Sequence, residues 1–260
     1  MSAAAVMLVR DEQQIIETTV RHLLANVDTV YVLDNRSTDL TPMLLDRLRV
    51  RHGSRVVVEH DPEVGYFQDR KTTELARRAH ADGHEWIVPC DADELWYAPA
   101  GYPLNAWLSR LPRSIGCVQA RLLNHVDVTW RTVTTDSQSI VDRLPHRLIE
   151  AGALPKVAVR WTPDAWIEMG NHGARGYAGA VGGGLLVRHF PWRGENEYVR
   201  KIRNGQEAYA ATDYPDAIGS HWRVWEGKPD EAIREHYRRW FIVGDDRAHE
   251  VVYDPATVMA

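Results

Sequence analysis

The sequence predicts an α/β fold of the Rossmann-like kind, with a mostly parallel sheet flanked by helices. Three observations support this prediction. Apolar runs of strand length alternate with helical patterns over the first ninety residues. These runs are continuous rather than alternating, which is typical of strands covered on both faces. Polar and acidic residues directly follow several runs, at the edge where parallel sheets bind their ligands.

The first half alternates four expected strands with three expected helices. The expected strands are residues 4–9, 30–33, 55–59 and 85–90. The first helix follows Asp11, which can cap it, and its apolar face at helical spacing is formed by Ile15, Ile16, Val20, Leu23 and Leu24. The second begins at Thr41-Pro42, because proline is tolerated in a first turn, and stops near Gly53. The third spans 68–81.

The second half is less regular. Its strand-like segments are residues 115–123, 139–148, 156–161 and 184–190, and its expected helices are 195–212 and 229–240. The glycine-rich segment 176–184 is a candidate lid. No internal repeat and no linker rich in Pro, Gly or Ser divides the chain, so we expect a single domain over residues 1–260.

The composition excludes several classes of protein. The net charge of −5 lacks the basic excess of a generic nucleic-acid binder. The two cysteines, Cys90 and Cys117, form no CxxC pair and indicate a reducing compartment, so we expect a cytoplasmic protein. No apolar run approaches membrane-spanning length, and the apolar start reads as a strand rather than a signal peptide. Ten Trp and twelve His suit carbohydrate and metal recognition, although both are also ordinary core residues.

The strongest local feature is Asp91-Ala92-Asp93-Glu94, directly after the fourth expected strand. Two carboxylates two residues apart at a strand end can both reach one divalent cation. Such a cation can in turn bridge the oxygens of a diphosphate. A turn rich in Asp is the alternative, and the position after a buried strand favours the metal.

Four motifs resemble the GT-A glycosyltransferases of the family 2 type, in the bacterial and phage branch with DNxSTDxT and DxDE motifs. They are residues 7–12 (MLVRDE), 32–41 (VLDNRSTDLT), 88–94 (VPCDADE) and 189–193 (HFPWR) followed by Tyr198 and Lys201. The resemblance implies a GT-A fold, a nucleotide-sugar donor that is usually a UDP-sugar, and Mn²⁺ or Mg²⁺. It makes residues 1–95 the nucleotide-sugar-binding half. Residues 96–260 then form the acceptor-side half with C-terminal helices.

Carried over position by position, the resemblance implies two groups of ligand-binding residues. Asp34 would accept a hydrogen bond from the base, and the other nucleotide-binding positions are Val9, Arg10, Glu12, Asn35, Asp91 and Ala92. Arg70 or Lys71 would stack on the base or meet a phosphate, with solvated charges at a helix start as the alternative. The implied metal ligands are Asp91, Asp93 and His189, with His172 as the competitor for the third position.

The remaining roles concern the leaving group, the base and the acceptor. Arg193 and Lys201 would neutralise the departing diphosphate. An inverting transfer needs a carboxylate to take the acceptor proton, and our candidates are Asp142 and Glu168, with Asp164 also in the region. Indole rings can pack on a sugar face, so the acceptor side is expected near Trp161, Trp166, Trp192, Trp222 and Trp225. Ordinary core packing is the alternative for each of them.

The predicted function is a metal-dependent glycosyltransferase of the hexosyltransferase type that moves a sugar from a UDP-sugar to a hydroxyl acceptor with inversion. Polysaccharide, lipid-linked glycan, protein and a modified DNA base all remain open as acceptors, and the acidic charge disfavours nucleic acid. One rival is another metal-dependent phosphate enzyme, either a nucleotidyltransferase or a phosphohydrolase. The other is a non-catalytic carbohydrate-binding protein of the same fold.

Overall fold

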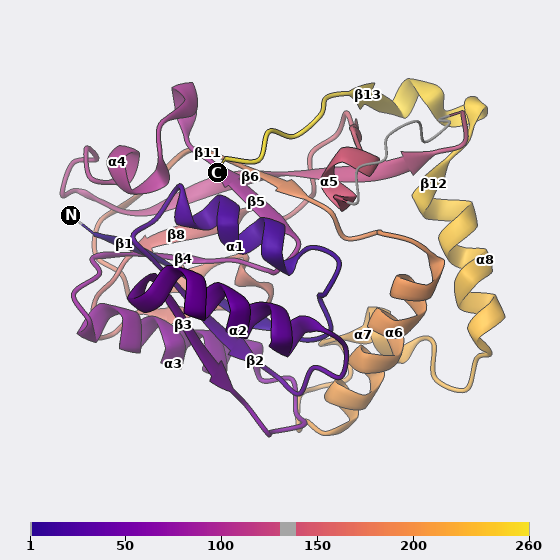
Figure 1. Cartoon of the computed structure of the whole chain (residues 1–260), viewed down its shortest axis with the longest axis horizontal. Helices are drawn as coiled ribbons and strands as arrows, with labels where there is room; N and C mark the ends of the chain where they lie inside the picture. Colours follow the sequence, from indigo (N-terminus) through magenta and orange to yellow (C-terminus); the bar gives the residue numbers. More distant parts are fainter. Residues whose placement is uncertain (1, 131–138, 260) are drawn as a thin grey trace.

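The computed structural model describes residues 2–130 and 139–259 and contains a large sheet flanked by helices (Figure 1). Its N-terminal half is a parallel sheet with the strand order β4-β1-β2-β3. These strands are β1 (Ala3–Val9), β2 (Thr29–Asp34), β3 (Val56–His60) and β4 (Trp86–Pro89). The alternation of strands and helices predicted from the sequence is confirmed, and so is the predicted fold class.

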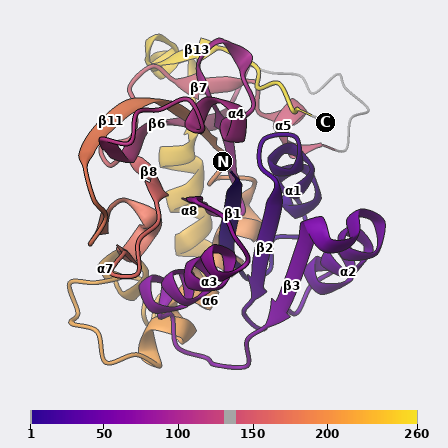
Figure 2. The same cartoon turned by 90° about the vertical axis from the view of Figure 1, so that its left-hand side faces the viewer.

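Three helices cover the two faces of this parallel sheet, with α1 and α2 on one side and α3 on the other (Figure 2). They are α1 (Ile16–Leu24), α2 (Thr41–His52) and α3 (Gln68–Ala81). Alternate residues of β1 point to opposite faces, because side chains alternate along a strand. Ala5 and Met7 pack with α1 and α2, whereas Ala4 and Val6 pack with α3. Since both faces of β1 are covered, its apolar run is continuous.

The second half extends the sheet with mixed strand directions. Strand β8 is antiparallel to β4 and β6, and β11 is parallel to β6 and antiparallel to β5. The strands are β5 (Glu94–Tyr97), β6 (Ile115–Val128), β7 (His146–Leu148), β8 (Lys156–Arg160), β11 (Ala180–His189), β12 (Ile242–Val243) and β13 (Val251–Tyr253). Strands β9 (Trp166–Ile167) and β10 (Ala174–Arg175) form a separate pair.

Helices of the second half lie mainly beyond the carboxyl ends of the N-terminal strands. Those drawn in orange to yellow in Figure 1 are α6 (Glu195–Ala210), α7 (Ser220–Arg223) and α8 (Asp230–Phe241). Two shorter helices are α4 (Leu104–Leu108) and α5 (Ile140–Arg143). The end of α6 is joined to the loop before α3 by a hydrogen bond from Tyr66 N to Ala208 O at 3.1 Å.

Two expectations for the second half are corrected by the structure. Residues 139–148 were expected as one strand, but they form α5 and the short β7. One buried cluster contains Ile140, Val141 and Leu144 together with Phe190. In a strand, the neighbours Ile140 and Val141 would point to opposite faces and could not both join this cluster. The glycine-rich segment 176–184 was the candidate lid, but its residues 180–184 belong to β11, which pairs with β6 within the sheet.

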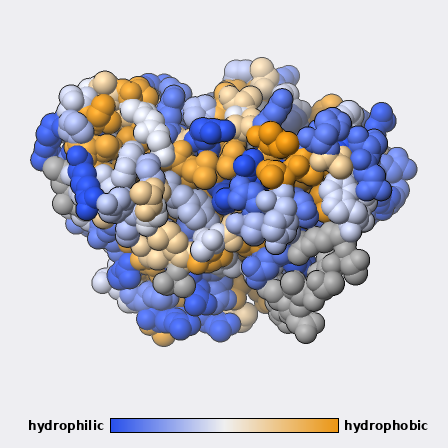
Figure 3. Space-filling view, turned by 90° about the horizontal axis from the view of Figure 1, so that it is seen from above, coloured by the Kyte–Doolittle hydropathy of each residue, from blue (hydrophilic) through white to orange (hydrophobic). Residues whose placement is uncertain are grey.

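No helix within residues 2–130 and 139–259 is long and apolar enough to cross a lipid bilayer. Figure 3 shows one face of the molecule, seen from above, with apolar side chains in separate patches between hydrophilic ones. Scattered patches of this kind are ordinary on protein surfaces.

A close backbone approach beside β11 generates a test of the fold. A methyl group added at Gly116 would lie 1.9 Å from the carbonyl oxygen of Ala178, so the two segments would have to separate. We expect Gly116→Ala to destabilise the protein by about 1–3 kcal/mol, as overpacking does. Gly183→Ala is the control, because a methyl group at Gly183 meets nothing within 4 Å. Urea unfolding measures both, and equal midpoints for the two variants would contradict this account of the sheet.

Candidate active site

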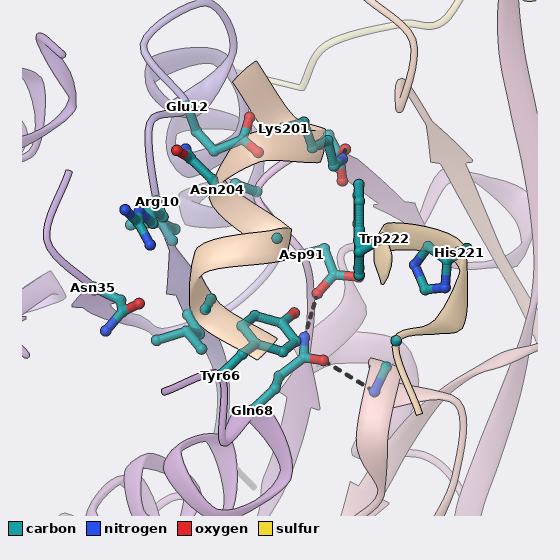
Figure 4. A pocket seen from close by; sticks show the side chains of 18 of the residues that line it. Arg10, Glu12, Asn35, Tyr66, Gln68, Asp91, Lys201, Asn204, His221 and Trp222 are labelled. Carbon is teal, nitrogen blue, oxygen red and sulfur yellow. Dashed lines mark hydrogen bonds and ion pairs between the residues drawn. The ribbon is translucent and has the colours of Figure 1, made fainter. Parts of the chain in front are cut away.

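A cavity of about 560 Å³ opens beyond the carboxyl ends of β1 and β4 (Figure 4). Its walls come from the segments that follow those strands, from the loop 169–172, and from α6 and α7. Figure 4 shows Arg10 and Asn35 on one side of the cavity and Trp222 and His221 on the other. The position agrees with the general rule that open α/β sheets bind ligands at the carboxyl edge.

The structure brings most of the predicted site residues together around this cavity. Those that line it are Val9, Arg10, Glu12, Asn35, Asp91, Ala92, Asp93, His189, Arg193 and Lys201. They come from all four sequence motifs, which are up to about 190 residues apart along the chain. The competitor His172 lines the cavity as well.

Five predicted residues do not line this cavity. Asp34 is buried and contacts His60 Nδ1 at 3.2 Å. Lys71 pairs with Asp61 at 2.6 Å, and Arg70 and Lys71 both line a separate cavity of about 290 Å³. The candidate bases, Asp142 of α5 and the exposed Glu168, also lie outside the lining.

Asp93 is the meeting point of three cationic or basic side chains. Its Oδ2 accepts hydrogen bonds from Lys201 Nζ at 2.8 Å and from Arg193 Nη1 at 3.2 Å. His189 Nε2 lies 3.4 Å from Oδ1, and Nδ1 of the same ring donates to Asn124 Oδ1 at 2.8 Å. Burial raises the pKa of Asp93, but the Lys201, His189 and Arg193 charges outweigh it and hold that pKa well below its ordinary value.

Asp91 belongs to a different network, centred on Lys156. The ammonium of Lys156 is buried and contacts Asp91 Oδ2 at 2.6 Å, Glu94 Oε1 at 2.8 Å and the Gly170 carbonyl at 2.7 Å. Burial lowers the pKa of Lys156, but the Asp91 and Glu94 charges raise it overall, so the ammonium stays charged. Sequence reasoning missed Lys156, although a lysine at the start of an apolar strand was a signal that it needs a buried partner.

Two further hydrogen bonds fix the loop 169–172 against this network. Gln68 Nε2 donates to Asp91 Oδ1 at 3.0 Å, while Gln68 Oε1 accepts from the backbone N–H of Gly170 at 3.0 Å (Figure 4). Asn171 Nδ2 donates to the same Asp91 oxygen at 2.9 Å. The carboxylate of Asp91 is therefore engaged by three different side chains.

Helix α6 forms the roof of the cavity. Asn204 Nδ2 donates to Asp11 Oδ2 at 2.6 Å, and Arg200 donates to the Asp11 carbonyl at 2.7 Å. Glu207 pairs with Arg10. Sequence reasoning identified Lys201 on this helix but missed Arg200 and Asn204, because nothing in the local pattern indicates which helix face meets the strand ends.

Only one of the five proposed acceptor-side tryptophans lines the cavity. Trp222 packs against Gly205 of α6, where an added methyl group would lie 2.7 Å from its ring. The other four pack elsewhere: Trp161 in the core, Trp166 beneath Arg77 and Arg175, Trp192 on Phe241, and Trp225 in the helical cluster. For these four the structure favours the packing alternative.

The described residues contain no group of three or more His, Cys, Asp or Glu side chains that could hold a metal ion. Of the three implied ligands, Asp93 and His189 are in contact, whereas Asp91 points its carboxylate at Lys156. His172 donates from Nδ1 to the Pro155 carbonyl at 2.9 Å.

The sequence model of glycosyl transferase family 2 matches residues 4–170, well over half of the 260 residues. The chain belongs to this family, and the protein is therefore a glycosyltransferase, as its motifs predicted. The nucleotidyltransferase, phosphohydrolase and non-catalytic alternatives are set aside on this ground. No curated protein is significantly similar to the chain in sequence.

Several solved structures are similar to the chain at low identity. Residues 1–349 of TarS from S. aureus, in complex with UDP, share 12% identity over 85% of this chain and 69% of that one, with a TM-score of 0.38. GalNAc-T7 with UDP, GalNAc and Mn²⁺ shares 14% identity over 96% of this chain and 58% of that one, with a TM-score of 0.44. Glucosyl-3-phosphoglycerate synthase from Mycobacterium tuberculosis, with Mn²⁺, UDP and glucosyl-3-phosphoglycerate, shares 20% identity over 46% of this chain and 44% of that one, at 0.30.

The buried network around Lys156 predicts a large stability effect. Lys156→Met leaves Asp91 and Glu94 without their counter-charge, and breaking a buried pair from one side costs about 3–5 kcal/mol. The loss should shrink as the pH falls from about 7 to 5, because protonation of Glu94, whose pKa burial already raises, removes the uncompensated charge.

The control for this variant is Arg113→Met. Arg113 pairs with Glu85 at 3.1 Å, but its side chain is 76% exposed, and exposed pairs contribute about 0–1 kcal/mol. Denaturant unfolding at both pH values measures the two variants. A loss below about 1 kcal/mol for Lys156→Met would show that the network does not hold the site together.

Proposed function

We propose that this protein transfers a sugar from a UDP-sugar to a hydroxyl acceptor, with inversion and with the help of a divalent cation. The observation that carries the proposal is the convergence of Lys201, Arg193 and His189 on Asp93 within the cavity. Membership of glycosyl transferase family 2 supports the reaction class. Residues 1–95 would supply most donor contacts and residues 96–260 the acceptor side, within one domain.

We assign the nucleoside to the cavity wall formed by Val9, Arg10 and Asn35. Asn35 Nδ2 donates to Asp61 Oδ2 at 2.9 Å and to the Glu63 carbonyl at 2.6 Å, so its Oδ1 is the atom available to accept from a base. An acceptor atom suits the imide N–H of uracil. Asp34, the residue expected from the sequence to meet the base, does not line the cavity, which supports Asn35 in that role.

Asp93 and His189 are the residues that would hold the cation. Two ligand atoms that each bond one metal ion at about 2.0–2.2 Å lie roughly 3 Å or slightly more from each other. The distance of 3.4 Å between Asp93 Oδ1 and His189 Nε2 fits this requirement. The hydrogen bond from Nδ1 to Asn124 fixes the ring and leaves Nε2 as the ligand atom. A carboxylate together with an imidazole favours Mn²⁺ over Mg²⁺. The bound cation would supply charge neutralisation at the diphosphate.

The reaction itself requires stabilisation of the leaving group. As the acceptor oxygen bonds to the anomeric carbon, the bond from that carbon to the diphosphate breaks and negative charge develops on the diphosphate. Lys201 and Arg193 lie in the same cavity and are permanently charged near neutral pH, so they can stabilise this charge without moving far. Residues of helix α6 and Trp222 form part of the cavity wall around these cations.

We propose a carbohydrate or other hydroxyl compound as the acceptor, with Trp222 as the surface for one sugar ring. The acidic net charge of −5 argues against nucleic acid. Cys90 and Cys117 are both free and buried, which supports the reducing, cytoplasmic compartment that we propose.

The test is release of UDP from a panel of UDP-sugars in the presence of Mn²⁺. Asp93→Asn should lower the rate by about a thousandfold, or roughly 4 kcal/mol, because the carboxylate that organises the cation and both basic side chains is lost. It should also remove the stabilisation that UDP with Mn²⁺ gives in a thermal shift assay.

The control is Asp46→Asn, since Asp46 of α2 is exposed and lies outside the cavity lining. This variant should keep both activity and thermal shift. Transfer by Asp93→Asn at more than about a tenth of the wild-type rate, a deficit below 1.4 kcal/mol, would contradict the assignment.

A further inference from the structure

The carboxylates that line the cavity are all engaged within the described part of the chain. Their partners are Thr38 and Asn204 for Asp11, Arg193 for Glu12, Lys156 for Asp91, Lys201 for Asp93, and Arg200 for Glu197. The two carboxylates expected from the sequence as bases, Asp142 and Glu168, lie outside the lining. The cavity nevertheless needs a group that can take a proton from the acceptor hydroxyl.

His172 has the required protonation pattern. Its Nδ1 lies 2.9 Å from the carbonyl oxygen of Pro155, and a carbonyl can only accept, so Nδ1 carries the ring proton. In the neutral ring the lone pair is then on Nε2. His172 lines the cavity, and Nε2 makes no hydrogen bond within residues 2–130 and 139–259. A neutral imidazole anchored through one nitrogen and open at the other is the form that a general base requires.

Burial, together with two nearby basic side chains, lowers the pKa of His172 and favours the neutral ring at rest. Burial lowers its pKa first, and the Lys156 ammonium lowers it further, with a smaller contribution from His189. The hydrogen bond to the Pro155 carbonyl and the Asp91 charge act in the opposite direction and raise this pKa. Lys156 contacts both Asp91 and Glu94, so these carboxylates compensate its positive charge. When His172 takes up a proton, the resulting imidazolium is therefore not repelled by an uncompensated cation.

The loop that carries His172 is held in place by its neighbours. The Gly170 carbonyl accepts from Lys156 and its N–H donates to Gln68, the contact drawn in Figure 4. Gly170 has φ of +74°, and a methyl group added there would lie 2.5 Å from the His172 ring. The ring therefore packs closely against a backbone turn that favours glycine, which limits its movement.

Two other histidines line the cavity and are weaker candidates. His189 contacts Asp93 and is assigned above to the cation. His221 of α7 packs against Trp222, with ring centroids 4.6 Å apart, but neither of its nitrogens has a partner in the described residues that fixes the tautomer.

We infer that His172 is the general base of the transfer reaction and takes the acceptor proton on Nε2. This inference rests on the proposed function. In the step, the acceptor oxygen forms a bond to the anomeric carbon while the bond from that carbon to the diphosphate oxygen breaks. The electron pair of the broken bond leaves with the diphosphate, and the hydroxyl proton passes to Nε2. The imidazolium then returns this proton to water.

The experiment compares wild type, His172→Ala and His221→Ala with an active UDP-sugar and Mn²⁺. We expect kcat of His172→Ala to fall by about a hundredfold to ten-thousandfold, the usual contribution of a general base. The affinity for UDP with Mn²⁺, measured by calorimetry, should stay within about twofold, because no donor contact is removed. At saturating Mn²⁺ and donor, where the cation occupies His189, kcat of wild type should fall as the pH falls and the His172 ring is protonated, and His172→Ala should lose this acid limb.

Added imidazole distinguishes a base from a structural residue. It should restore part of the activity of His172→Ala, whereas His221→Ala should keep the acid limb and gain nothing. The inference is overturned if His172→Ala retains more than a tenth of the wild-type kcat, if its acid limb persists, or if excess Mn²⁺ rather than imidazole restores it. If wild type releases no UDP from any donor, the proposed function fails and the inference falls with it.

Discussion

The buried carboxylate of Asp93 is the constraint on which the arrangement of the site depends. It belongs to the N-terminal half, and its partners Arg193, Lys201 and His189 all belong to the second half. A buried carboxylate without partners costs several kcal/mol, so the chain gains stability only when β11 and α6 are both docked at the strand ends. The same contacts that close the fold therefore assemble the cations that a diphosphate needs.

The two aspartates of the DxD motif serve different sides of the cavity. Asp93 turns towards α6, whereas Asp91 turns towards β8 and the loop that carries His172. In an extended chain, residues two positions apart point the same way. Asp91 and Asp93 point in different directions because the chain turns tightly after β4, where the backbone N–H of Glu94 donates to the Asp91 carbonyl. Each aspartate thereby organises one wall, and Ala92 between them is small enough to stay buried.

Much of this architecture could be predicted from the sequence. Continuous apolar runs at β1 to β4 predicted parallel strands, and motif order placed Arg10, Asp93 and Lys201 in one site. What could not be predicted depends on tertiary pairing. Residues 139–148 have enough β-branched side chains for a strand, but burial against Phe190 makes part of them helical. The lysine at the start of β8 indicated a buried partner, but the local pattern does not identify Asp91 and Glu94 as the two carboxylates that surround it.

Each cationic side chain described above in the cavity is paired with a carboxylate, and this pairing affects which anions the site can bind. A small anion such as inorganic phosphate would have to draw Lys201 or Arg193 away from Asp93 and leave that carboxylate buried without compensation. A diphosphate that arrives together with a divalent ion offers a new partner to both sides at once. Binding of the diphosphate with its cation therefore exchanges ion-pair partners and leaves the net charge of the site nearly unchanged. Simple salts are poor competitors for this site, although it contains several basic side chains.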